Sequence, residues 1–188
     1  MKAGKPTVLR YAVAVPVGPD LVVTAAAPVE NATEFQLESP DGDSFKGELV
    51  RRDPVSKLAL IRIAGKHMPY LNLATGFNGG EVVCWGFPEV IVFNPIAEFL
   101  GGSATAPKAG VWTVSLRRHP RLMGAAILDG KGALVGITTG DRDTLATQMT
   151  AVTLEQLRAF LGADAPRTAC SNPNPSGVMQ LTASHEAQ

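Results

Sequence analysis

The sequence predicts an all-β protein. Short runs of aliphatic and β-branched residues recur from Val8 to Val152, separated by glycine, proline, aspartate and asparagine. Hydrophobic residues make up 45% of the chain and aromatic residues only 6%, so we expect an aliphatic core. The runs follow one another without the regular helical segments of βαβ units, which favours a β-barrel or a β-sandwich.

A β-hairpin is the clearest local feature. Residues 34–38 alternate apolar and polar side chains, and the turn sequence Pro-Asp-Gly-Asp at 40–43 leads into a second run at 44–50. Because alternate side chains of a strand share one face, the apolar residues of this hairpin and of the next strand should form one core. The expected members are Phe35, Leu37, Phe45, Leu49, Leu58, Leu60 and Ile63.

The other strands are expected at short apolar runs bounded by turn residues. These runs are residues 8–15, 21–26, 58–63, 81–86, 110–116, 133–138 and 147–152. We interpret residues 67–80 as a crossing between two halves of the chain.

One helix is expected near the end of the chain. Residues 153–156 read Thr-Leu-Glu-Gln, which is a capping box, and Leu157, Phe160 and Leu161 form an apolar stripe that Gly162 ends. Residues 163–188 have few bulky apolar side chains and contain three prolines. Such a composition does not offset the entropy lost on ordering, so we expect a flexible tail.

Composition limits the possible functions. The 188 residues fit one domain or two small barrels that share a seam. Because 17 basic residues balance 17 acidic ones, we expect no nucleic-acid partner. No apolar run reaches the roughly 18 residues of a membrane helix, and no signal-peptide core follows Met1, so a soluble chain is expected. Its compartment depends on whether Met1 is the natural start: cytoplasmic as written, periplasmic or extracellular otherwise.

Three separated segments carry a recognisable set of motifs. Residues 22–26 read Val-Val-Thr-Ala-Ala, residues 53–61 read Asp-Pro-Val-Ser-Lys-Leu-Ala-Leu-Ile, and residues 121–129 read Arg-Leu-Met-Gly-Ala-Ala-Ile-Leu-Asp. In order and spacing they resemble the motifs of the trypsin-like serine proteases, most closely the high-temperature-requirement (HtrA-like) branch. The resemblance covers about residues 8–162 and implies a two-barrel trypsin-like (chymotrypsin) fold with a short C-terminal helix.

This resemblance also implies a domain organisation. An N-terminal extension at 1–7 precedes a first β-barrel at 8–66, the crossing occupies 67–80, and a second barrel with the helix occupies 81–162. The tail at 163–188 follows.

The resemblance places the catalytic triad at Ala27, Lys57 and Met123, where the family has histidine, aspartate and serine. Acyl transfer by that triad needs a hydroxyl nucleophile, an imidazole base and a carboxylate that orients the imidazole. A methyl group, an ammonium group and a thioether provide none of these. We therefore expect a catalytically inactive pseudoprotease that acts as a protein- or peptide-binding or scaffolding module, with no cofactor.

The loop before Met123 is a candidate binding element. Its basic residues are Arg117, Arg118, His119 and Arg121. Guanidinium groups suit a carboxylate or a phosphate, and the alternative is an ordinary solvated loop. Arg121 also stands where the family has a glycine that shapes the oxyanion hole, so we expect a rebuilt backbone there.

Alternative interpretations remain open at several residues. Met123 either fills space left by a lost active site or serves a new cleft, and Lys57 is either solvated or a base. Cys84 lies in an apolar run and should behave as a small hydrophobe, with no disulfide to Cys170. His67, His119 and His185 are too scattered for a metal motif. The rival function is a hydrolase with a relocated or misaligned active site, and a third interpretation is that the chain is one domain of a larger assembly.

Overall fold

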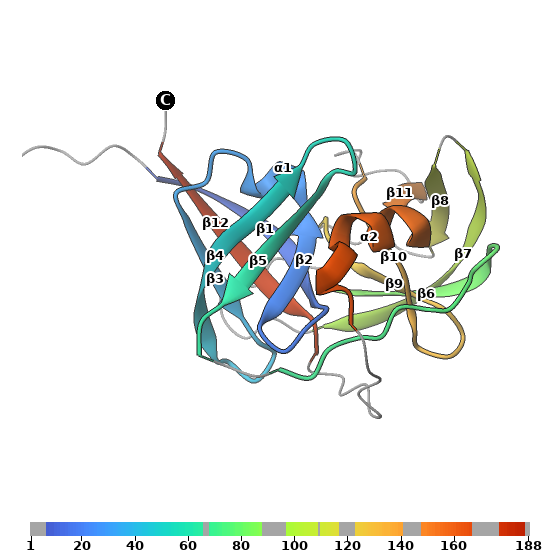
Figure 1. Cartoon of the computed structure of the whole chain (residues 1–188), viewed down its shortest axis with the longest axis horizontal. Coiled ribbons are helices and arrows are strands. Elements are labelled where there is room, and N and C mark those ends of the chain that lie inside the picture. Colours follow the sequence, from blue (N-terminus) through green and yellow to red (C-terminus); the bar gives the residue numbers. More distant parts are fainter. Residues whose placement is uncertain are drawn as a thin grey trace, which may run out of the picture.

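A closed β-barrel and a six-stranded antiparallel sheet lie side by side (Figure 1). The computed structural model describes residues 7–65, 68–87, 97–108, 110–116, 123–140, 148–166 and 177–186. Both halves consist of β-strands, and only short helices accompany them. The predicted all-β, two-barrel trypsin-like fold is confirmed.

The barrel takes five strands from the start of the chain and one from its end. They are β1 (Thr7–Pro16), β2 (Leu21–Ala25), β3 (Glu34–Glu38), β4 (Ser44–Asp53), β5 (Leu58–Ile63) and β12 (Met179–Glu186). Their order around the barrel is β1-β12-β3-β4-β5-β2. The predicted hairpin is confirmed, because β3 pairs with β4 and places Leu37 opposite Phe45.

The second half is a sheet with the strand order β10-β9-β6-β7-β8-β11. Its strands are β6 (Gly80–Gly86), β7 (Glu98–Lys108), β8 (Val111–Leu116), β9 (Ala126–Leu128), β10 (Leu134–Ile137) and β11 (Gln148–Val152). Strands β7 and β9 were not expected from the sequence. β7 contains Gly101 and Gly102 and exposes most of its residues, so it lacks the apolar signal that marks a strand.

The helices are short. α1 (Ala26–Val29) follows β2, and α2 (Leu154–Leu161) lies against β10 and is followed by the 3₁₀ turn η1 (Gly162–Asp164). α2 begins with the predicted capping box between Thr153 and Gln156 and ends at Gly162, whose φ is 53°. Its buried side chains include the predicted Leu157, Phe160 and Leu161. No helix among the described residues is long and apolar enough to span a membrane.

The flexible tail expected at 163–188 is wrong for residues 179–186. They form β12, which pairs with β1 on one side and β3 on the other and so closes the barrel. Met179, Leu181 and Ala183 alternate with polar residues and point into the buried core. The prolines precede this short run, and the composition of the whole segment concealed its alternation.

Two apolar clusters hold the molecule together. One fills the barrel and includes Phe35, Leu37 and Ile63, as predicted. The other, the seam cluster, joins the outer face of the barrel to the sheet and α2, and it contains Leu58 and Leu60. The single core predicted for these residues is therefore wrong, because neighbouring residues of β5 face opposite sides of the barrel wall.

The predicted burial of Leu49 is also wrong. Leu49 keeps 37% of its surface exposed. It lies beside a register shift in the pairing of β4 with β5, between Leu49 and Arg51. An extra residue at such a point bends the strand and interrupts the regular alternation of its faces.

Candidate functional site at the seam

Ala27 lies in α1, at the point where the chain leaves β2. The backbone N–H of Ala26 donates a hydrogen bond of 2.8 Å to the carbonyl oxygen of Lys57, which ties α1 to the turn between β4 and β5. Ala27 is exposed, and its carbonyl oxygen accepts a hydrogen bond of 3.4 Å from the guanidinium group of Arg10. The first predicted triad position is therefore a solvent-facing residue on a short, anchored helix.

Lys57 ends the turn that connects β4 to β5. The carboxylate of Asp53 accepts hydrogen bonds from the backbone N–H groups of Val55 and Ser56, at 2.9 and 3.1 Å, and so holds the turn. Lys57 has a φ of 59°, in the left-handed region that few non-glycine residues adopt. Its side chain is exposed and takes part in no ion pair among the described residues.

Met123 is held against β1. Its carbonyl oxygen accepts a hydrogen bond of 2.7 Å from the N–H of Val13. The next residue, Gly124, has a φ of 88°, and a Cβ there would lie 2.2 Å from the carbonyl oxygen of Val13 and 2.6 Å from Oγ1 of Thr24. The N–H of Gly124 donates to the carbonyl oxygen of Thr138 at 2.8 Å. Only glycine fits this crossing between the barrel and the end of β10.

All three predicted triad positions line one open pocket at the seam between barrel and sheet. This Lys57 pocket has a volume of about 550 Å³. Its described lining residues are Ala25, Ala26, Ala27, Glu30, Arg52, Pro54, Lys57, Met123, Thr139 and Gly140. The structure thus brings together residues that are 30 to 96 positions apart in the sequence.

A second pocket adjoins the first. This Tyr11 pocket has a volume of about 390 Å³ and is lined by Leu9, Arg10, Tyr11, Ala27, Pro28, Glu30 and Met123. Ala27, Glu30 and Met123 line both pockets, so the two are neighbouring parts of one hollow.

An unpaired strand edge borders the Tyr11 pocket. The N–H of Val13 donates to Met123, and its carbonyl oxygen accepts a hydrogen bond of 2.7 Å from the hydroxyl of Thr24, so both groups point away from β12. Alternate residues of a strand direct their backbone groups to the same side, so those of Tyr11 point the same way. β2 pairs only with the last two residues of β1. No strand in the described part of the chain covers the edge at Tyr11.

One ion pair lies at the boundary of the two pockets. The guanidinium group of Arg52 is 2.6 Å from the carboxylate of Glu30. The hydrogen bond and the charge of Arg52, with a smaller effect from Arg10, hold the pKa of Glu30 below its ordinary value. Glu30 is therefore ionised at neutral pH, and Arg52 offsets its charge.

The other residues that the sequence singled out are not among the described lining residues of this site. Arg117, Arg118, His119 and Arg121 lie outside the described residues, as do His67 and Cys170. His185 is buried on β12, and its Nε2 lies 3.0 Å from the carbonyl oxygen of Pro28. The described ranges contain no cluster of potential metal ligands.

Cys84 is buried in β6 within the seam cluster. Burial raises the pKa of its thiol to about 12, because the thiolate would lose its hydration. The thiol is therefore protonated at neutral pH, which disfavours a nucleophilic role.

Sequence reasoning missed several lining residues. Glu30 follows Ala27 by one helical turn, and Arg52 directly precedes the motif at 53–61. Their closeness in sequence to the motif positions is the signal that could have found them. Tyr11 and Thr139 lie in segments without a motif, and only the closure of the barrel against the sheet brings them to the site.

The fold and the position of the site define a class: two-part β proteins whose cleft lies at the seam of the halves. A family model described as a trypsin-like peptidase domain matches residues 12–137, which is more than half of the chain. The chain therefore belongs to the trypsin-like peptidase family. No curated protein matches the sequence.

Proposed function

We propose that this family member does not hydrolyse peptides and instead binds a peptide or an extended protein segment in the hollow at the seam. The observation that carries the proposal is the meeting of Ala27, Lys57 and Met123 around one open pocket. These positions lie where the family's motifs place its catalytic groups, and the hollow remains accessible.

The chemistry of the lining supports the loss of activity. A thioether has no proton to lose, a methyl group accepts none, and an ammonium group repels an imidazolium. Removal of the nucleophile or the base in a comparable hydrolase lowers turnover on the order of 10⁶-fold. Three such replacements leave no route through this triad.

The shape of the hollow supports the binding of an extended chain. The two pockets share lining residues, and the Tyr11 pocket lies along the free edge of β1. Backbone N–H and C=O groups at such an edge can pair with an added strand, while side-chain pockets beside it provide specificity. A peptide that pairs at Tyr11 would place a neighbouring side chain near Met123.

A relocated active site is the second candidate. Thr139 brings the one hydroxyl group among the described residues of the Lys57 pocket. A threonine nucleophile needs an adjacent base, and Lys57 is a candidate for that base in the same lining. The side chain of Lys57 is exposed, and the described structure shows no hydrogen bond between it and Thr139, so this alternative has less support.

Two measurements test the proposal. A serine-directed fluorophosphonate should label the full chain no more than it labels a heat-denatured sample. The full chain should also hydrolyse a chromogenic ester no faster than that sample does. Turnover that survives repurification would refute the inactive assignment. For binding, a phage-displayed library of random peptides is selected on the full chain. The variant Ala27→Phe fills the hollow from an exposed position and should lose the selected peptides.

A matched control separates blocking from general effects of a new aromatic residue. Ala106 is an exposed alanine of β7 that lines neither pocket. Ala106→Phe should retain the selected peptides. If Ala27→Phe retains them equally well, peptide binding at this site is wrong.

A further inference from the structure

We infer that the Lys57 pocket selects an acidic residue of the bound peptide, with Lys57 as the group that recognises its carboxylate. This inference rests on the proposed function and specifies the chemistry of the partner. It starts from the charges in the hollow, since the chain as a whole has a formal net charge of zero.

The described lining of the two pockets contains more positive than negative charge. Arg10, Arg52 and Lys57 are cationic, and Glu30 is the acidic residue among them. Arg52 pairs with Glu30 at 2.6 Å, so these two charges largely offset each other. Arg10 donates to the carbonyl oxygen of Ala27. Lys57 is left as the cation whose side chain has no hydrogen-bond or ion-pair partner among the described residues.

The surroundings of Lys57 leave its ammonium group available. The nearby carboxylate of Asp53 is already occupied by two backbone N–H groups of the turn. The carbonyl oxygen of Lys57 accepts from Ala26, which fixes its backbone while the side chain stays exposed. A fixed backbone and a solvated lysine head suit a group that pairs with an incoming carboxylate.

Exposed apolar residues occur on the turn that carries Lys57 and in the adjoining Tyr11 pocket. Val55, at the tip of the same turn, exposes 88% of its surface, and Leu9, in the Tyr11 pocket, exposes 49%. A peptide with an acidic residue between apolar ones would place its carboxylate at Lys57 and cover these side chains. Such apolar contacts would supply affinity, whereas the charge pair would supply selectivity.

The test compares the peptides that the protein selects with and without the cation. Phage-displayed random peptides are selected on the full chain, and those lost on Ala27→Phe define the peptides specific to the hollow. We expect aspartate and glutamate to be enriched among them. Synthetic copies should bind Lys57→Gln about two- to fivefold more weakly, as expected for an exposed ion pair, and their affinity should fall as sodium chloride is raised.

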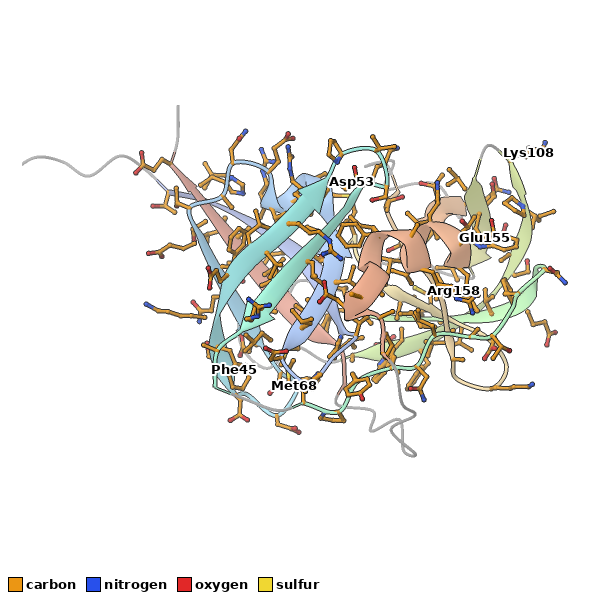
Figure 2. All side chains as sticks on the ribbon, in the orientation of Figure 1. Phe45, Asp53, Met68, Lys108, Glu155 and Arg158 are labelled. Atoms are coloured by element: carbon orange, nitrogen blue, oxygen red, sulfur yellow. The ribbon has the colours of Figure 1, made fainter. Side chains whose placement is uncertain are left out.

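Two further variants keep the result interpretable. Lys57→Asn serves if Lys57→Gln unfolds, because asparagine readily adopts the left-handed backbone that this position requires. Lys46→Gln is the control: Lys46 is exposed at the other end of β4, about 20 Å from the turn at about 3.3 Å per residue. Figure 2 shows its neighbour Phe45 and the turn residue Asp53 at opposite ends of that strand.

The outcomes distinguish this inference from the proposed function. Acidic peptides that bind both Lys57 variants more weakly and Lys46→Gln normally support it. Peptides specific to the hollow that show no acidic enrichment, or that bind Lys57→Gln unchanged, overturn the inference while peptide binding stands. A selection that yields no peptide specific to the hollow removes the proposed function and this inference with it.

Discussion

The guanidinium group of Arg51 donates a hydrogen bond of 3.0 Å to the carbonyl oxygen of Leu161. Arg51 belongs to β4 of the barrel, whereas Leu161 is the last residue of α2, so this contact joins the two halves. The same guanidinium pairs with Asp164 at 2.9 Å and lies over the ring of Phe160. A cation at the C-terminal end of a helix also interacts favourably with the unpaired carbonyl groups there.

Arg51→Ala should therefore lower the free energy of unfolding by about 1–2 kcal/mol, because charged hydrogen bonds to the helix end are lost from a partly exposed site. Urea denaturation followed by circular dichroism measures it. Arg62→Ala is the control, since Arg62 forms an exposed ion pair of 3.5 Å with Asp20 and should change stability little. Equal effects of the two variants would contradict a special role for Arg51.

Leu60→Ala should lower the free energy of unfolding by about 2–5 kcal/mol, because a fully buried leucine is removed from the seam cluster and a cavity remains. Leu49→Ala removes the same atoms from an exposed position on the neighbouring strand. We expect less than about 1 kcal/mol for it. The same denaturation measurement compares the two variants. A small effect of Leu60→Ala would mean that the register described for β5 is wrong.

Gly124→Ala should destabilise the fold by at least about 2 kcal/mol, because the new Cβ meets the carbonyl oxygen of Val13 and φ is positive. Gly130→Ala is the matched control, since a Cβ there meets nothing within 4 Å. Thermal unfolding of both variants gives the comparison. If Gly124→Ala has the same melting temperature as the unaltered protein, the close approach of Gly124 to β1 is wrong.

Ending the chain at Pro166 should abolish cooperative unfolding. The truncation leaves the edges of β1 and β3 without their partner β12 and removes Leu181 from the barrel interior. Calorimetry of the truncated and full chains tests this expectation. As a milder check, Thr182→Ala changes a half-buried residue that the barrel cluster does not include and should have little effect. A truncated chain with an unchanged melting temperature would restore the flexible-tail interpretation.

The triple change Ala27→His, Lys57→Asp and Met123→Ser should not restore hydrolysis of a chromogenic ester. Lys57 has left-handed backbone geometry, so the direction of a side chain there is set by the turn. The motif at 121–129 also lacks the glycine that the family uses for its oxyanion hole. Adding Arg121→Gly, Leu122→Asn, Ala125→Gly and Ala126→Pro is the informative comparison. Turnover by the triple variant alone would show that only side chains separate this chain from an active peptidase.

Local chemistry made several elements predictable. The hairpin at β3 and β4 carries period-two alternation around a turn sequence, and α2 carries both a capping box and a terminal glycine. Such signals act over a few residues and need no distant partner. The resemblance to the family placed the triad positions at Ala27, Lys57 and Met123, and these residues line one pocket.

The sequence by itself therefore determined the strand-rich class, the hairpin, the capped helix and the residue types at the predicted triad positions. Only the tertiary structure decided that Met179–Glu186 closes the barrel, because a weakly apolar strand becomes stable when two existing edges pair with it. Tertiary packing also decided that Leu60 faces the seam and that Tyr11 and Thr139 reach the hollow. Alternation tells which residues share a face, but which face meets the other half depends on contacts between strands far apart in the chain.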